Sequence, residues 1–117
     1  MQKAFTMTDS VQFSGQLYPE QMAEAATKGF KAIINNRPDM EGGAVQPTSA
    51  EMQTAAEMAG LAYVAQPVIA GQITEQDVKI FAEHLNALPK PVLIFCRSGA
   101  RSNNLYQLAK QMDLLND

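Results

Sequence analysis

Short apolar runs alternate with longer amphipathic segments along the chain, and this pattern predicts a strand followed by a helix four times over. Strands are expected at 11–14, 30–35, 61–65 and 92–95, and helices at 19–28, 49–59, 74–88 and 103–112. The last strand, Val92–Phe95, is apolar throughout, which is typical of a strand covered on both faces. The alternation therefore favours an α/β fold with a parallel sheet.

The helix boundaries in the sequence support this division. Thr48 and Glu51 have the spacing of a capping box, and Thr74 supplies a capping hydroxyl for the next helix. Gly29 and Gly60 stand where a glycine commonly closes a helix. The connections are short, so the predicted architecture is a three-layer α/β sandwich with a four-stranded parallel core sheet. Right-handed crossovers then bring the carboxyl ends of the strands to one edge, where ligands of such folds bind.

The size and composition of the chain fit this architecture. Its 117 residues are expected to form a single domain, 1–117, with 46% hydrophobic and 18% charged residues. One cysteine cannot form an internal disulfide, which indicates a cytoplasmic location. Met1–Ser10 lacks the apolar core of a signal peptide, and the longest apolar runs have five residues, against about 20 for a membrane span. No membrane association is expected.

The positive charges are few, and the arginines occupy informative positions. The net charge is −3 and there is no basic stripe, so nucleic acid is not an expected partner. The chain has three arginines, Arg37, Arg97 and Arg101, and each follows shortly after a predicted strand. Their guanidinium groups are therefore expected at the ligand-binding edge of the sheet. An acidic protein that concentrates its arginines there is expected to bind a small anion.

The strongest chemical signal is the only cysteine, Cys96, which directly follows the last predicted strand. A strand, a compact polar loop and a helix in that order form an anion cradle, because loop N–H groups and the helix N-terminus point inward. A thiol with a pKa near 8.5 is about 3% ionised at neutral pH, whereas a pKa of about 6 would make it about 90% thiolate. Cys96 is the candidate nucleophile, Arg101 is its anion-binding partner, and the loop contributes Arg97, Ser98, Gly99, Ala100 and Ser102.

Other chemistries find less support in the residues. Cys96 could instead be a small buried hydrophobe at a strand end, but the arginine, serine and glycine loop beside it favours a reactive thiol. His84 is the only histidine and is expected at the surface, so neither a zinc site nor a Cys–His dyad is predicted. The GxxxxGK[ST] phosphate loop is absent, and we expect no metal and no cofactor.

Three stretches together resemble a known family: Cys96–Ser102, Ile33–Asp39 and Gly60–Gly71. They are similar to the phosphatase-like bacterial domain of beta-lactamase-hydrolase-like proteins, and the similarity covers nearly the whole chain. The resemblance implies a fold of the phosphotyrosine and dual-specificity phosphatase type, with Cys96 as nucleophile and Arg101 as anion-binding partner. It also implies that Asn36 and Arg37 lie near the loop. Such domains occur alone or fused to persulfide dioxygenase domains, so a persulfide dioxygenase is a candidate partner.

Two departures from the phosphatase pattern favour sulfur chemistry. Phosphatases of this fold place five residues between cysteine and arginine, whereas four separate Cys96 from Arg101, and Ser102 takes the expected arginine position. The shorter loop is typical of rhodaneses and suits one sulfur atom better than a phosphoryl group. These phosphatases also carry an aspartate about thirty residues before the cysteine, as a general acid worth about 10²–10⁴-fold. The stretch 66–71 holds no carboxylate.

The predicted function is therefore a cysteine-dependent sulfurtransferase with a persulfide on Cys96. Its substrate would be a small anionic sulfane sulfur donor such as thiosulfate or a glutathione persulfide. Two alternatives stay open. The first is a phosphatase that hydrolyses phosphomonoesters through a phosphocysteine, and the second is a non-catalytic module that binds anions or docks onto a partner.

Overall fold

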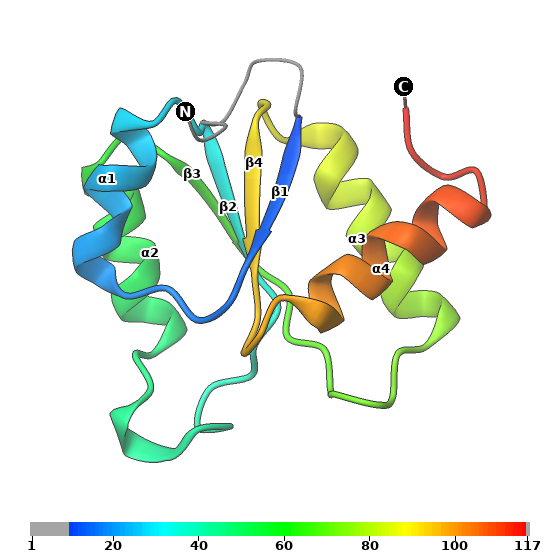
Figure 1. The fold of residues 1–117 in the computed structure, drawn as a ribbon, viewed down its shortest axis with the longest axis horizontal. Helices are drawn as coiled ribbons and strands as arrows, with labels where there is room; N and C mark the ends of the chain where they lie inside the picture. The colour runs from blue at the N-terminus through cyan, green and yellow to red at the C-terminus, as the bar shows by residue number, and fades with distance from the viewer. Residues whose placement is uncertain (1–9, 117) are drawn as a thin grey trace, which may run out of the picture.

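The sheet consists of the four predicted strands. The computed structural model describes residues 10–116. Of the segment Met1–Ser10, which was predicted not to be a signal peptide, only Ser10 lies within the described residues. Within them the strands are β1 (Val11–Ser14), β2 (Ala32–Asn35), β3 (Ala62–Ala65) and β4 (Val92–Phe95). All pairs are parallel, and the order across the sheet is β1-β4-β2-β3 (Figure 1).

Helices cover both faces of this sheet. In Figure 1, α1 and α2 lie on one side of the sheet and α3 and α4 on the other, which makes the three predicted layers. The capping boxes at Thr48 and Thr74 are present and start α2 and α3, respectively. The helical segments are η1 (Pro19–Gln21), α1 (Met22–Thr27), η2 (Gly43–Val45), α2 (Ser49–Met58), α3 (Glu75–Ala87) and α4 (Ala100–Gln111).

Two hydrophobic cores fill the spaces between the layers. Alternate residues of the central strands enter opposite cores, because successive side chains of a strand point to opposite faces. Ile34 and Ile94 pack with α3 and α4, whereas Ile33 and Phe95 pack with α1 and α2. The uninterrupted apolar run of β4 is explained by this double burial.

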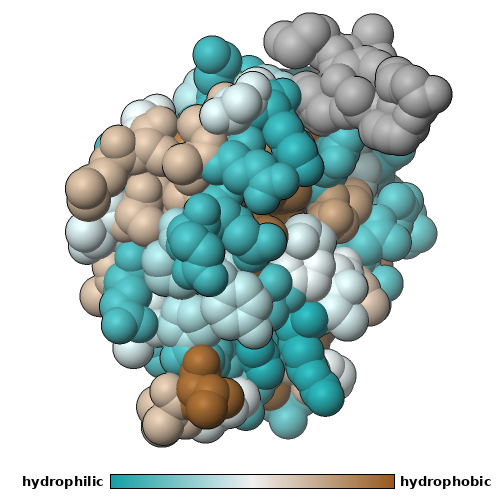
Figure 2. Space-filling view, turned by 60° about the vertical axis from the view of Figure 1, so that its left-hand side comes forward, coloured by the Kyte–Doolittle hydropathy of each residue, from teal (hydrophilic) through white to brown (hydrophobic). Residues whose placement is uncertain are grey.

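The surface on the α1 and α2 side is mostly polar (Figure 2). Figure 2 shows the α1 and α2 side of the molecule as largely hydrophilic, with apolar side chains in several separate places. No helix in the part of the chain that the structure describes is long and apolar enough to cross a membrane.

The parallel register brings the loops after three strands together. Ser14 of β1 and Asn35 of β2 both pair with Phe95, the last residue of β4. Backbone hydrogen bonds continue one residue beyond the ends of β4 and β2. Cys96 N donates to Ser14 O at 3.3 Å, and Asn36 N donates to Phe95 O at 2.9 Å. Cys96 therefore leaves the sheet between the segments that follow β1 and β2.

The last helix begins earlier than the sequence pattern predicts. Apolar periodicity predicts a start at residue 103, but α4 begins at Ala100. Gly99 adopts a left-handed φ of 96°, which turns the chain sharply from the cysteine loop into the helix. Arg101 and Ser102 consequently lie in the first turn of α4 rather than in the loop.

Candidate active site

Cys96 lies at the bottom of a short, tightly turned loop. The residue is 1% exposed, and its sulfur accepts the Gly99 N–H at 3.1 Å. A Cβ atom at Gly99 would come within 3.4 Å of the Ser14 backbone, and its positive φ would strain any other L-residue. The sequence therefore needs glycine here to fold the loop back over the sulfur.

The surroundings of Cys96 favour its thiolate. Burial raises the pKa of the thiol, but hydrogen bonds from the Ser102 N–H, the Ser102 hydroxyl and the N–H groups of Gly99 and Ser98 outweigh it. The pKa of Cys96 is therefore lowered from the ordinary value of 9.0. A thiolate without a histidine partner is thus stabilised by neutral donors alone.

The same contacts make the sulfur a helix cap. The N-cap residue of α4 is Gly99, which has no side chain to accept the N–H groups of the first turn. The sulfur of Cys96 accepts the backbone N–H of Ser102, the third helical residue. It therefore occupies the place of an N-cap oxygen, where the helix dipole also favours a negative charge.

Ser102 connects this loop to the segment after β2. Its hydroxyl lies 2.8 Å from Asn36 Oδ1, and Asn36 Nδ2 donates to Gln66 O at 3.0 Å. Asn36 and Ser102 are both 0% exposed. A hydroxyl carries one hydrogen, so Ser102 donates either to Asn36 or to the sulfur, and the ionised sulfur is the stronger acceptor.

The guanidinium of Arg101 is buried beside the pocket and only partly satisfied. Nη1 donates to Val68 O at 3.0 Å and lies 3.5 Å from Asn36 O, while Nη2 donates to Glu41 at 3.1 Å. Within residues 10–116, Nε has no hydrogen-bond partner. A buried cationic donor without a partner is what an anion-binding site presents before its ligand arrives.

Glu41 holds two of the arginines together, and sequence reasoning missed it. Its carboxylate accepts from Arg37 Nε at 2.8 Å and from Arg101 Nη2 at 3.1 Å. Burial raises the pKa of Glu41, but the two guanidinium groups lower it below the ordinary value of 4.5. The sequence gives little signal for this pair, because a four-residue spacing brings side chains together on a helix, and residues 37–41 are not helical.

Asn36 and Arg37, which the family resemblance places near the cysteine loop, differ in how they reach it: Asn36 directly and Arg37 through Glu41. Asn36 contacts the loop directly through Ser102. Arg37 reaches Arg101 through Glu41 instead, and its Nη1 donates to Gln16 Oε1 at 2.9 Å. Arg37 therefore supports the site without reaching the sulfur.

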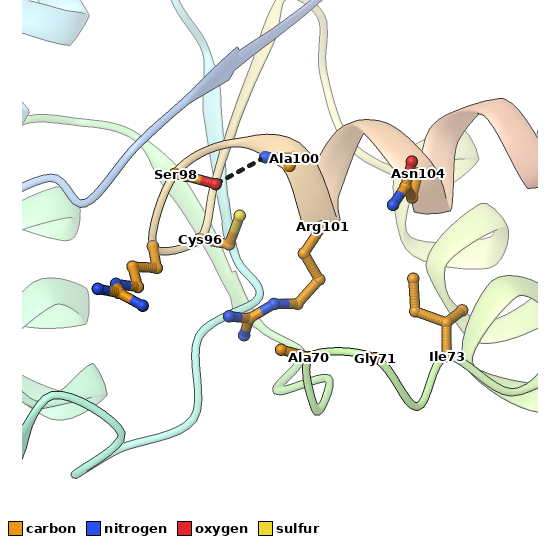
Figure 3. Close-up of a pocket in the computed structure, with 9 residues that line it drawn as sticks. Ala70, Gly71, Ile73, Cys96, Ser98, Ala100, Arg101 and Asn104 are labelled. Carbon is orange, nitrogen blue, oxygen red and sulfur yellow. Dashed lines mark hydrogen bonds between the residues drawn. The ribbon is translucent and has the colours of Figure 1, made fainter.

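A pocket of about 530 Å³ opens above the cysteine loop (Figure 3). The predicted residues Cys96, Arg97, Ser98, Ala100 and Arg101 line it. No carboxylate or histidine lines this pocket, and no cluster of three metal-ligating side chains occurs among the residues described. Sequence reasoning missed the remaining lining residues, which are Ala70, Gly71, Ile73 and Asn104.

Replacing Ser102 by alanine is expected to raise the pKa of the Cys96 thiol, because the thiolate loses its hydroxyl donor. The rate of alkylation by iodoacetamide at neutral pH should fall roughly 10-fold. Ser98→Ala is the matched control, since Ser98 contributes to the thiolate through its backbone N–H. An equal loss of rate in both variants would contradict the role assigned to the Ser102 hydroxyl.

Replacing Glu41 by glutamine is expected to change the pH dependence of stability. The pKa of Glu41 is lowered in the folded state, so its stabilisation is present above about pH 4.5 and is lost as the pH falls through the lowered pKa. Wild type should exceed Glu41→Gln by about 1 kcal/mol in free energy of unfolding at neutral pH. The difference should shrink in urea titrations at acid pH, and a constant difference would contradict the ion pairs.

Comparisons with known proteins support the predicted family. The family model for the phosphatase-like domain of beta-lactamase hydrolase-like protein matches residues 4–113. The beta-lactamase hydrolase-like protein of Xylella fastidiosa (strain Temecula1) is 37% identical over 111 residues, which are 95% of this chain. Those residues are 26% of the relative, so the chain spans about a quarter of the length of the curated relatives it matches.

Solved structures confirm the predicted fold. A candidate phosphatase from Neisseria meningitidis Z2491 superimposes with a TM-score of 0.83 at 32% identity, covering 94% of this chain and 78% of that one. P. aeruginosa TpbA in complex with pTyr superimposes with a TM-score of 0.64 at 16% identity, covering 88% of this chain and 60% of that one. The three-layer arrangement predicted from the sequence is therefore a phosphatase-like fold. Together with the family match, these similarities show that the chain belongs to the family of the phosphatase-like domain of beta-lactamase hydrolase-like proteins.

Proposed function

We propose that this domain is a cysteine-dependent phosphatase that hydrolyses a small phosphate monoester through a phosphocysteine. The observation that carries the proposal is the buried Cys96 sulfur, which has a lowered pKa and lies in one pocket with Arg101, whose Nε is unpaired. The relative from N. meningitidis, described as a candidate phosphatase, supports this reaction. The main proposal is thus the alternative of the sequence analysis, and the sulfurtransferase becomes the second candidate.

The proposed reaction has two displacement steps at phosphorus. The Cys96 thiolate attacks the phosphorus, and the ester P–O bond breaks with its electron pair passing to the leaving oxygen. Because no carboxylate lines the pocket, that oxygen takes its proton from water, so esters of acidic phenols are the favoured substrates. Water then attacks the phosphocysteine, and the S–P bond breaks to release phosphate and the thiolate.

The loop N–H groups and Arg101 supply the electrostatic part of this reaction. The N–H groups of Ser98, Gly99 and Ser102 surround the sulfur, so we expect them to donate to the oxygens of a phosphoryl group once it is bound to Cys96. Arg101 Nε is the additional donor for this charge, since the two terminal nitrogens are already hydrogen-bonded. Arg97 is exposed at the pocket wall and supplies a further positive charge.

Sulfur transfer remains as a second candidate because of one specific observation. Only four residues separate Cys96 from Arg101, and the arginine is anchored to Val68 and Glu41 rather than wrapped around the loop. In this reaction the thiolate attacks the outer sulfur of thiosulfate, the S–S bond breaks, and sulfite leaves with the electron pair. A thiol acceptor then takes the sulfur from the persulfide. Such a transfer needs no general acid.

Mass spectrometry of the covalent intermediate separates the two reactions. After acid quenching of a reaction with an aryl phosphate, a phosphatase should carry about 80 Da on Cys96, one phosphoryl group. After incubation with thiosulfate, a sulfurtransferase should carry about 32 Da there, one sulfur atom. Cys96→Ser is the blank for both measurements. If neither adduct forms and neither substrate is turned over, both reactions are overturned. The domain would then be a non-catalytic anion-binding or docking module.

The chain covers about a quarter of its curated relatives, so the larger proteins contain much more than this domain. A persulfide dioxygenase as partner and a cytoplasmic location remain the predictions of the sequence analysis. The expected ligand is a small anionic phosphate ester, since Arg97 and Arg101 line the pocket beside Cys96.

A further inference from the structure

The pocket extends well beyond the cysteine loop. In Figure 3, Cys96 and Ser98 lie at one side, Arg101 lies in the middle, and Ile73 and Asn104 lie at the other side. We call the part lined by Gly71, Ile73 and Asn104 the distal end, whereas Ala70 lies beside the guanidinium of Arg101 (Figure 3). A phosphoryl group on Cys96 fills only a small part of the 530 Å³, so the distal end is available to the rest of the substrate.

The two ends of the pocket differ in charge. The cysteine end carries Arg97 and Arg101, whereas no residue of the distal end is charged. The acidic residues that open the next helix, Glu75 and Asp77, do not line the pocket. An anionic group at the distal end would lose hydration without gaining a cationic partner there.

The distal end offers one hydrogen-bonding side chain between apolar contacts. Asn104 is exposed on α4, and its amide makes no hydrogen bond within the described part of the chain. Figure 3 shows that Asn104 and Ile73 approach this end of the pocket from two different elements, α4 and the loop before α3. An amide is both donor and acceptor, so it can pair with a neutral amide, carbonyl or hydroxyl.

We propose that the distal end binds the body of the substrate and selects esters whose body is uncharged, partly apolar and hydrogen-bonding. Asn104 is the specificity-determining residue, and Ile73 supplies the apolar contact. This inference rests on the proposed phosphatase and names its substrate class. Esters with a carboxylate on the body are disfavoured, because no cationic side chain lines the distal end.

The test uses two aryl phosphates of the same shape, para-carbamoylphenyl phosphate and para-carboxyphenyl phosphate. They differ in charge at the distal position, and because their phenols also differ as leaving groups, the comparison is made between variants. Asn104→Ala should lower kcat/KM for the carbamoyl ester roughly 5-fold and change the carboxylate ester less than about 2-fold. Asn103→Ala is the matched control, since Asn103 is exposed on the same helix and does not line the pocket.

The outcomes separate this inference from the phosphatase proposal. If wild type hydrolyses the esters, and Asn104→Ala lowers kcat/KM equally for both esters or for neither, the distal end does not select the body of the substrate. If wild type hydrolyses neither ester, the phosphatase proposal fails, and calorimetric titration of Cys96→Ser with both esters decides. Tighter binding of the carbamoyl ester that is lost in the Cys96→Ser, Asn104→Ala double variant supports the inference. Equal affinity or no binding overturns it.

Discussion

Cys96→Ser is expected to lower kcat/KM for an aryl phosphate by about 10⁴-fold or more. The substitution keeps the size of the side chain, but a serine hydroxyl does not ionise near neutral pH, so the nucleophile is lost. The hydrogen bonds that lower the pKa of Cys96 come from neutral groups, and none of them is a base that could activate a hydroxyl. Initial rates of aryl phosphate hydrolysis measure the loss, and residual activity within 100-fold of wild type would contradict the mechanism.

The same substitution is expected to reveal the thiolate in the folded protein. The folded-state pKa of Cys96 lies below the ordinary 9.0, so the stabilisation it gives is complete above pH 9.0 and is lost as the pH falls through the lowered pKa. The free energy of unfolding of wild type, relative to Cys96→Ser, should therefore rise with pH up to about 9.0. Urea titrations across this range measure it, and parallel curves would mean that folding leaves the pKa unchanged.

Arg101→Lys is expected to lower kcat/KM roughly 100-fold and to destabilise the fold by about 2–3 kcal/mol. The terminal nitrogens of the guanidinium donate to Val68 O and Glu41, so Nε is the nitrogen that can donate to the anion. A lysine keeps the charge but has one ammonium group, which cannot reach partners on several sides at once. The loss should therefore appear in both catalysis and stability.

Arg97→Lys is the control for this prediction. Arg97 also lines the pocket, but its side chain is exposed and makes no hydrogen bond within residues 10–116. Its replacement should leave the free energy of unfolding within about 0.5 kcal/mol of wild type. If Arg101→Lys is equally neutral in urea titrations and kinetics, the guanidinium fork contributes neither to the fold nor to anion binding.

The fold could be predicted because its signals are local. The strand–helix alternation, the continuous apolar run of β4 and the caps at Thr48 and Thr74 each depend on residues close in sequence. Those signals also placed Cys96 and the arginines at one edge of the sheet. The start of α4 was predicted three residues late, because apolar periodicity cannot detect a helix whose first turn is held by a sulfur.

The details of the site could not be predicted for a geometric reason. The pocket joins the loop before α3 to the first turns of α4, segments about thirty residues apart, so no spacing rule relates Ile73 to Asn104. The sequence predicts Arg101 as the anion-binding partner of Cys96, but it does not predict which acceptors hold the guanidinium. The structure directs its terminal nitrogens to Val68 and Glu41, because those acceptors lie within reach of a buried fork.

The sulfur that caps α4 has a consequence for covalent inhibitors. A phosphocysteine keeps negatively charged oxygens that can accept the N–H groups of the first turn, so the helix start is held throughout a catalytic cycle. A neutral alkyl thioether accepts these bonds poorly and removes the charge that the helix dipole favours. An alkylating inhibitor of Cys96 would therefore loosen the helix that carries Arg101 and Asn104, and so weaken the binding surface as well as blocking the nucleophile.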